Sequence, residues 1–414
     1  MEQTPKSLRL QIGLFGRTNA GKSSFLNLVC GQNVSVTSEI PGTTTDVVEK
    51  SVELLPIGPV LFLDTAGLND DSALSGKRLE KTEAVFDRAE IFVCITEPGV
   101  WGETEEKIAT EALKRKVPLI IVINKTDIET PSGDFLNLCK KRTELVMTCS
   151  SLANSDSDKT IAAFKALLLK AADDERIAAP SIIGDLVRPG GIVVLITPID
   201  LQAPRGRLIL PQVQTIRDAL DNDACAIVVK EREYKQALQK LAALPDLVIC
   251  DSQVVMKMVA DTPETVPCTT FSILFSRYKG DLAEQIKGLK AIDSLKSHDK
   301  VLIAEACSHH ALADDIGRVK IPRWLRQYTG ADLDITISAG RDYPADIDKY
   351  SLVIHCGSCM LTRHETLLRI NRAKELGIPV TNYGLCIAKI QGVLSRALSP
   401  FPFALATVAE LSMR

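Results

Sequence analysis

The sequence predicts an α/β protein of three domains, in which a larger doubly wound sheet is followed by two smaller parallel sheets. With 414 residues, the chain is long enough for two or three domains, each with its own core. Short apolar runs alternate with polar helical stretches, which is the pattern of parallel strands joined by crossover helices. The first strand also runs directly into a glycine-rich loop and a helix, as in doubly wound folds that bind phosphate.

The composition is that of an ordinary soluble globular protein. Hydrophobic residues make up 45% of the chain and charged residues 24%, which excludes collagen-like and disordered classes. The 49 Lys and Arg residues nearly balance the 52 Asp and Glu residues, and the net charge of -3 provides no basic field for nucleic acid. We find no secretory signal and no apolar run of the roughly 20 residues that span a bilayer. We therefore expect a cytoplasmic protein that binds neither nucleic acid nor membranes.

The first predicted domain covers residues 1–174. Strands are expected at four apolar runs, each followed by a helical stretch. From Lys170 to Pro189 the chain becomes charged and then contains proline, which is typical of a helix end followed by a connector. The four runs are LQIGLFG (10–16), VLFLD (60–64), EIFVCIT (90–96) and PLIIVIN (118–124).

A second, smaller domain is predicted at residues 184–262. Its sheet is too small to bury much surface alone, so we expect it to pack on another domain or on a second copy of the chain, which makes dimerisation its natural role. The third domain, residues 263–414, repeats the alternation. Expected strands of these two domains are GIVVLI (191–196), ACAIVV (224–229), DLVIC (246–250), TFSILF (270–275), VLIAEA (301–306), LVIH (352–355) and PVTN (379–382).

The first strand is followed by G-x-x-x-x-G-K-S, the phosphate-loop motif. Gly16 and Gly21 allow backbone N–H groups to surround phosphates, and Lys22 reaches the β and γ phosphates. The Ser23 hydroxyl binds Mg²⁺, and Ser24 belongs to the same phosphate-binding set. The motif stands between a strand and an apolar-periodic helix, which is the context that it requires.

Two further motifs complete a magnesium and γ-phosphate site. Asp64 and Gly67 belong to D-T-A-G after an apolar strand, where the carboxylate can hold the Mg²⁺ shell and the glycine can approach the γ phosphate. Residues 41–46, P-G-T-T-T-D, are similar to the G-T-T-R-D switch of TrmE/Era-like GTPases. In that switch the second Thr closes on Mg²⁺, and Thr44 takes this position here. Lys22, Thr44 and Gly67 are the expected catalytic groups.

A base-recognition motif follows the strand at 118–123. Asn124, Lys125 and Asp127 form N-K-x-D, which resembles the guanine-specificity motif of the GTPase superfamily. The Asp carboxylate accepts both guanine donors, which adenine cannot supply as a pair, so the nucleotide should be GTP. Ser150 would belong to the weaker guanine-base loop.

Two residues bear on the rate of hydrolysis. Leu68 stands where Ras-type enzymes carry a water-orienting Gln, which predicts slow intrinsic hydrolysis. Asn19 matches the Asn that helps bind a potassium ion in TrmE-like enzymes. It could equally be an Asn favoured by the turn.

A cysteine-rich constellation marks the third domain. Cys307 and His309 follow one strand, while Cys356 and Cys359 follow another, so their side chains can meet at one rim of a parallel sheet. Three thiolates suit a [4Fe-4S] cluster with a different ligand on one iron, and three thiolates plus His309 would also suit Zn²⁺. If the strand stays extended, Glu305, Cys307 and His309 share a face, which makes Glu305 and His309 candidates for the fourth position. The other eight of the 11 cysteines are expected to be mostly core residues.

Together, the GTPase motifs, the small middle unit and the C-x-H and H-C-x-x-C motifs resemble the [FeFe]-hydrogenase maturation GTPase, the HydF family. The resemblance implies a homodimer of GTPase, dimerisation and cluster-binding domains. It implies GTP, Mg²⁺ and a [4Fe-4S] cluster as cofactors, with K⁺ as a further candidate. It also implies a scaffold that receives a di-iron precursor made with two radical-SAM maturases and delivers it to apo-[FeFe]-hydrogenase.

Two alternatives remain from the residues alone. One is a potassium-activated TrmE/Era-like GTPase that acts on RNA and carries a structural zinc site, which the absence of a basic run disfavours. The other is a nucleotide-regulated redox enzyme, which would turn over a substrate with a reversible cluster couple.

Overall fold

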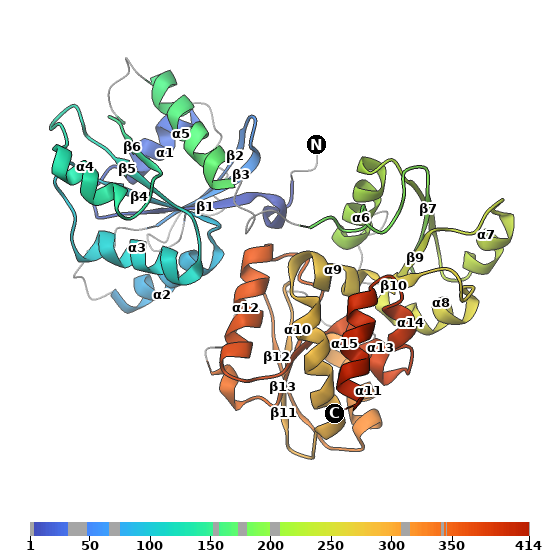
Figure 1. Cartoon of the computed structure of the whole chain (residues 1–414). Coiled ribbons are helices and arrows are strands. Elements are labelled where there is room, and N and C mark those ends of the chain that lie inside the picture. Colours follow the sequence, from blue (N-terminus) through green and yellow to red (C-terminus); the bar gives the residue numbers. More distant parts are fainter. Residues whose placement is uncertain are drawn as a thin grey trace. The chain divides into compact units, whose positions relative to one another are not determined.

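The computed structural model describes residues 4–31, 48–65, 75–151, 157–172, 180–198, 208–307, 315–340, 343–344 and 346–413. The chain divides into two compact units, residues 1–178 and 179–414 (Figure 1). The site candidates Thr44, Gly67 and His309, and also Leu68, lie outside the described residues. None of the described helices combines the length and the apolar character that crossing a bilayer requires.

The first unit is built on a six-stranded sheet with the order β2-β3-β1-β4-β5-β6. Neighbouring strands are parallel except for the antiparallel pair of β2 and β3. The central strands coincide with the four predicted apolar runs, whereas the edge strands β2 and β6 were not predicted. The strands are β1 (Leu10–Phe15), β2 (Val48–Leu54), β3 (Gly58–Asp64), β4 (Ile91–Thr96), β5 (Leu119–Ile123) and β6 (Val146–Thr148).

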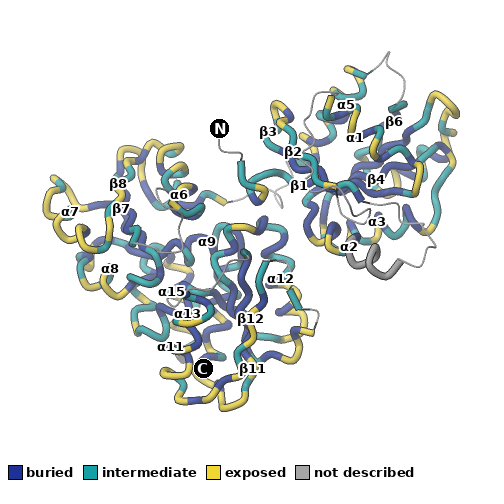
Figure 2. The backbone as a smooth tube through the Cα atoms, turned by 180° about the vertical axis from the view of Figure 1, so that it is seen from behind, coloured by how far each residue is buried: buried dark blue, intermediate teal, exposed yellow. Residues whose placement is uncertain are grey.

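Helices cover both faces of this sheet, as the doubly wound prediction requires. On one face, α1 (Lys22–Cys30) and α5 (Ser157–Ala172) meet through Phe25 and Phe164, whose ring centroids are 5.0 Å apart. On the other face, Phe15, Phe86 and Phe92 form a buried aromatic cluster. The helices on that face are α2 (Ser75–Arg88), α3 (Glu103–Arg115) and α4 (Gly133–Lys140). The central strands β1, β3, β4 and β5 are mostly buried between the two helical layers, whereas the edge strand β2 is largely not (Figure 2).

The described part of the second unit contains two four-stranded sheets, both entirely parallel. The first has the order β10-β9-β7-β8, and the second has the order β12-β11-β13-β14. This arrangement confirms the predicted fold class. The strands are β7 (Ile192–Ile196), β8 (Cys225–Val229), β9 (Leu247–Cys250), β10 (Cys268–Thr270), β11 (Lys300–Ala304), β12 (Asp334–Ser338), β13 (Leu352–His355) and β14 (Val380–Asn382).

One continuous apolar cluster joins these two sheets. It includes Leu195 of β7 and Ile303 of β11 together with Phe275 and Leu385 from two helices. The small middle sheet therefore buries apolar surface against the C-terminal part of the same chain. The helices of this unit are α6 (Leu210–Asp221), α7 (Tyr234–Lys240), α8 (Val255–Asp261), α9 (Phe271–Lys279), α10 (Leu282–Lys287), α11 (Ile321–Thr329), α12 (Arg363–Glu375), α13 (Tyr383–Ile390), α14 (Leu394–Ala397) and α15 (Pro402–Met413).

The expected strand at 270–275 is wrong. The strand β10 ends at Thr270, whose side chain accepts a hydrogen bond from the N–H of Ile273 and so begins helix α9. The helix is buried on most of its circumference, so its apolar run resembles that of a buried strand. The strand β10 pairs with β9 and completes the β10-β9-β7-β8 sheet.

The strand before the first cysteine is shorter than expected. The strand β11 ends at Ala304, so Glu305 and Cys307 are not part of an extended strand. The prediction of a shared face assumed that the strand stays extended, whereas the chain bends at Ala306 and Cys307. The third residue of that prediction, His309, lies outside the described residues.

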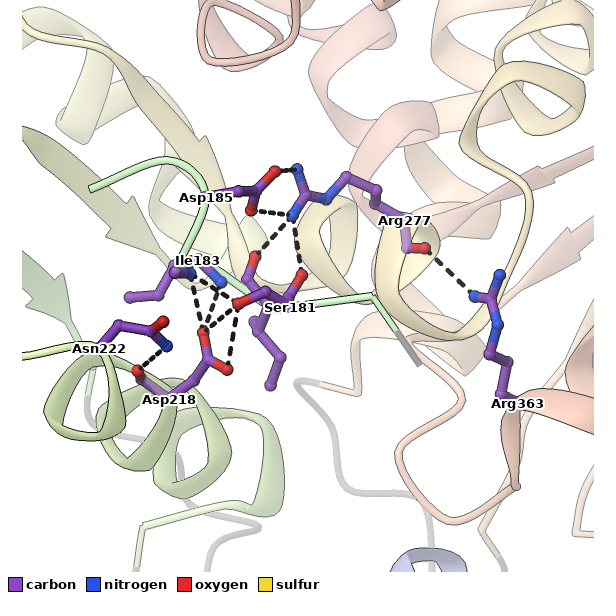
Figure 3. Close-up of polar contacts among 9 residues, drawn as sticks. Ser181, Ile183, Asp185, Asp218, Asn222, Arg277 and Arg363 are labelled. Carbon is purple, nitrogen blue, oxygen red and sulfur yellow. Dashed lines mark hydrogen bonds and ion pairs between the residues drawn. The ribbon is translucent and has the colours of Figure 1, made fainter. Parts of the chain in front are cut away.

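The leading segment of the second unit, residues 181–185, is held between α6 and α9 (Figure 3). The Asp218 carboxylate on α6 accepts hydrogen bonds from the N–H groups of Ile183, at 2.7 Å, and Gly184, at 3.0 Å. From the other side, the Arg277 guanidinium on α9 donates to the Ser181 carbonyl at 2.8 Å and to the Asp185 carboxylate at 2.9 Å. Both contacts fix the backbone of the leading segment.

We predict that Asp218→Ala destabilises the second unit by about 1–3 kcal/mol, because it leaves two backbone N–H groups without their charged acceptor. Chemical unfolding followed by circular dichroism measures the change. The matched control is Asp221→Ala on the same helix, where the exposed ion pair with Arg217 is screened by solvent and should contribute little. Equal effects of the two substitutions would contradict the anchoring role of Asp218.

Candidate functional site

The phosphate loop has the backbone conformation that its two glycines allow. Gly16 has φ 148° and Gly21 has φ 90°, both in the region that favours glycine. A Cβ at Gly16 would also collide with the carbonyl oxygen of Ile95, and one at Gly21 with the side chain of Asn124. Both positions therefore require glycine, and the loop is fixed against β4 and β5.

Lys22 lies over this loop at the start of α1. Its side chain is 8% exposed, and Nζ donates hydrogen bonds to the carbonyl oxygens of Gly16, at 3.1 Å, and Arg17, at 2.8 Å. Burial lowers the pKa of Lys22, and the nearby Asp64 carboxylate opposes this shift. Phosphate oxygens could replace the two carbonyls, which would give the buried ammonium an anionic partner.

Ser23 and Asp64 meet at the end of β3, as a magnesium shell requires. The Ser23 hydroxyl donates to Asp64 Oδ2 at 3.1 Å, while Asp64 Oδ1 is buried and forms no hydrogen bond within the described part of the chain. Burial raises the pKa of Asp64, opposed by the Ser23 hydrogen bond and by Lys22. A buried carboxylate oxygen beside a hydroxyl is a donor set that suits Mg²⁺.

Asn124 connects three parts of the nucleotide site. Its Nδ2 donates to the Ala20 carbonyl in the phosphate loop at 3.1 Å. Its Oδ1 accepts from the N–H of Ser151 at 3.0 Å and from the Ser151 hydroxyl at 2.8 Å, in the loop after β6. Ser151 was missed by the sequence reasoning, whereas the expected Ser150 has a buried hydroxyl without a hydrogen-bond partner among the described residues.

The remaining base-recognition residues lie on the same loop at the end of β5. Lys125 has φ 61° and its Nζ donates to Glu97 Oε1 at 2.7 Å. Asp127 is exposed, so its carboxylate is accessible to a ligand. Asn19 is also exposed, and its φ of 66° is a conformation that Asn tolerates better than most residues.

An ion pair between the half-buried Arg17 and a buried carboxylate joins the phosphate loop to α3, and no sequence motif indicates it. The Arg17 guanidinium donates to both carboxylate oxygens of Glu105, at 2.8 Å each, and Glu105 is 1% exposed. The same carboxylate accepts from the N–H of Gly102 at 2.9 Å. These residues stand 88 positions apart, so only the fold reveals the contact.

The second unit contains a cavity of about 220 Å³ that the three predicted cysteines line together. Cys307 follows β11, and Cys356 and Cys359 follow the neighbouring strand β13. Opposite them lie Phe271 and Phe275 of α9. We name this cavity the cysteine pocket. Within the described residues, no group of three or more His, Cys, Asp or Glu side chains is arranged to hold a single metal ion.

Electrostatic interactions among the three thiols contribute to the pKa shifts in this pocket. Burial raises the pKa of Cys307 to about 11 and that of Cys359 to about 12, and the neighbouring cysteines add to both shifts. The sulfur of Cys356 accepts hydrogen bonds from the N–H groups of Ala306, at 3.1 Å, and Ser358, at 3.4 Å. Such N–H donors stabilise a thiolate, and a metal would remove the proton that burial otherwise retains.

Of the two candidates for the fourth ligand, the structure describes Glu305 but not His309. Glu305 lines the pocket and is 3% exposed, but its Oε2 accepts two hydrogen bonds from Arg318, at 3.0 and 2.8 Å. Its Oε1 lies 3.5 Å from the Tyr383 hydroxyl. His309 lies outside the described residues. His355 is buried beside Tyr343, and burial lowers its pKa to about 3, so this imidazole is neutral.

Different family models match the two units of the chain. A family model described as 50S ribosome-binding GTPase matches residues 11–125. The hydrogen maturase F dimerization domain matches residues 182–280, and the hydrogen maturase F tetramerization domain matches residues 283–400. These two domains contain every residue that lines the cysteine pocket. The chain belongs to the hydrogen maturase F family.

Curated relatives of this hydrogen maturase F are GTPases that align with about a third of the chain. GTPase Der of Persephonella marina is 37% identical over 34% of this chain and 32% of its own length. The tRNA modification GTPase MnmE of Synechococcus sp. is 38% identical over 29% of this chain and 26% of its own length. The chain thus spans about a third of the length of these relatives or less. Both the predicted family and the predicted GTPase domain are confirmed.

Among solved structures, an Era variant from Aquifex aeolicus bound to GDP and aluminium fluoride aligns with a TM-score of 0.32 and 19% identity. The alignment covers 56% of this chain and 98% of Era.

Proposed function

We propose that this hydrogen maturase F is a GTP-hydrolysing scaffold that carries a [4Fe-4S] cluster and assembles or delivers the di-iron precursor of [FeFe]-hydrogenase. The observation that carries the proposal is the cysteine pocket, because three cysteines that follow two neighbouring strands line one cavity, whose lining belongs to the two hydrogen maturase F domains. The GTPase domain supplies a nucleotide site on a separate unit. Radical-SAM maturases and the apo-hydrogenase are the partners that we propose from the family.

The nucleotide half of the proposal rests on three contacts. Lys22 is buried over the phosphate loop, Ser23 and Asp64 form a pair suited to Mg²⁺, and Asn124 holds the base-recognition loop. Thr44 and Gly67 complete the proposed catalytic set with Lys22, since the switch must close on the γ phosphate before hydrolysis. Magnesium would neutralise phosphate charge between Ser23 and Thr44.

We predict that Lys22→Ala lowers GTP hydrolysis by about 100-fold or more, because the phosphates lose a buried cation that stabilises transition-state charge. Phosphate release under saturating GTP measures the rate. Iron content should stay at the parental level, since the cysteines belong to the other unit. The control is Lys140→Ala, an exposed lysine of α4, which should leave hydrolysis unchanged. A fully active Lys22→Ala protein would refute the assignment of the loop.

We predict that Asp127→Asn transfers the base preference from guanine to xanthine. The carboxylate accepts two donors of guanine, whereas the amide would offer one donor and one acceptor, which suits a base with a carbonyl in place of the amino group. Competition binding of GTP, XTP and ATP tests the exchange. Tight GTP binding by the variant, with XTP still excluded, would show that Asp127 does not contact the base.

The cysteine pocket fits a cluster in its donor chemistry. Cys307, Cys356 and Cys359 would each hold one iron, and N–H donors already point at the sulfur of Cys356. A cluster with three cysteines leaves one iron for an exchangeable ligand, which suits a carrier. We propose Glu305 and His309 as candidates for that position, although Glu305 would first have to release Arg318.

We predict that each of Cys307→Ala, Cys356→Ala and Cys359→Ala loses most of the cluster, because two thiolates do not hold a four-iron core. Iron and sulfide analysis after anaerobic reconstitution measures the loss. Glu305→Ala should instead retain iron and change the electron paramagnetic resonance signal of the reduced cluster. The control is Cys225→Ala, an exposed cysteine outside the pocket. Zinc in place of iron in the protein isolated without air would overturn the scaffold proposal.

A homodimer also belongs to the proposal, in keeping with the dimerization and tetramerization domains of the family. The strand β8 lies at one edge of the β10-β9-β7-β8 sheet and carries the exposed residues Cys225 and Val228. An apolar edge strand readily pairs with another copy.

A GTPase that acts on RNA with a structural zinc site is the weaker interpretation. Two of the relatives are named as tRNA modification GTPases, but each aligns with less than a third of this chain. Binding of K⁺ at Asn19 would be compatible with either function and does not separate them.

A further inference from the structure

A buried lysine lies directly behind the cysteine pocket. Lys279 is the last residue of α9 and is 2% exposed. Its ammonium donates to the carbonyl oxygen of Leu361 at 2.6 Å and to that of Cys359 at 3.3 Å. A buried ammonium is costly unless its donors are satisfied, so these contacts hold both the cation and the loop in place.

The loop between β13 and α12, which contains Cys356 and Cys359 and is called the cysteine loop here, also contacts α9 through a residue at its end. Arg363 begins α12, four residues after Cys359, and its Nη1 donates to the Tyr278 carbonyl at 2.6 Å. Figure 3 shows Arg363 reaching back to α9 at the carbonyl of Arg277, with a separation of 3.5 Å. Lys279 of α9 thus donates to the cysteine loop, and Arg363 at the end of that loop donates to α9. The position of the Lys279 charge relative to Cys359 is therefore fixed.

We propose that Lys279 is a positioning residue that sets the reduction potential of the cluster in the cysteine pocket. This inference rests on the proposed cluster. Reduction adds one negative charge to a cluster, and a fixed cation at a ligand residue stabilises the reduced form more than the oxidised form. The low dielectric of a buried site strengthens that difference, and net charge is among the factors that set cluster potentials.

Three substitutions separate charge from hydrogen bonding. Lys279→Gln removes the charge and keeps an N–H donor, Lys279→Met removes both, and Lys279→Arg keeps both. An electrostatic role predicts a more negative midpoint potential in the Gln and Met variants, by about tenfold in the redox equilibrium or about 59 mV for one electron. The Arg variant should stay close to the parent. A role confined to holding the loop would leave the Gln variant at the parental potential.

The experiment is a redox titration of the reconstituted full-length protein, monitored by electron paramagnetic resonance. The control is Lys287→Met on α10, an exposed lysine of the same unit, which should not move the potential. If the Met variant does not fold, the Gln and Arg variants decide. A cluster with the parental potential in the Gln variant would overturn the role of Lys279 and leave the scaffold proposal intact. A parent that binds no cluster would overturn both.

Discussion

Both candidate sites depend on the parallel pairing of neighbouring strands. Parallel strands bring their carboxyl ends to one edge of a sheet, so segments far apart in the chain meet there. Ala304 of β11 pairs with His355 of β13, and the chain leaves both strands for the cysteine pocket within the next few residues. In the first sheet, the same rule brings the loops after β1, β3 and β5 together.

Each site then places charged groups where water is largely excluded. Lys22, Glu105 and Glu305 are all less than a tenth exposed, and each has partners fixed by the backbone or by a second charged side chain. Burial without partners would cost several kcal/mol per group, so these contacts are conditions of folding as well as features of the sites. The described parts of these loops are thereby held in place by contacts within the protein, and such preorganisation lowers the conformational cost of binding a ligand.

The features predicted from sequence are those whose residues are close in the chain or end a buried strand. The phosphate loop, the N-K-x-D motif and the C-x-x-C motif meet this condition, and so do the central strands. The contact of Arg17 with Glu105 and that of Lys279 with Leu361 join residues more than 80 positions apart, and no local pattern announces them. The edge strand β12, with residues D-I-T-I-S, was missed because it is half exposed and short. The strand predicted at 270–275 was wrong for the opposite reason. A helix that is buried on most of its circumference lacks the polar–apolar periodicity that distinguishes a helix from a strand.

The helix α9 has a particular place in this architecture, because it contacts two functional segments through residues two positions apart. Arg277 holds residues 181–185, which lead into the second unit from the GTPase domain, and Lys279 holds the cysteine loop. The helix has nine residues, so both contacts stand on one short element. The GTPase motifs and the cysteine pocket belong to separate units of the chain. Within the described part of the second unit, α9 therefore contacts both the segment that follows the GTPase unit and the loop that carries Cys359.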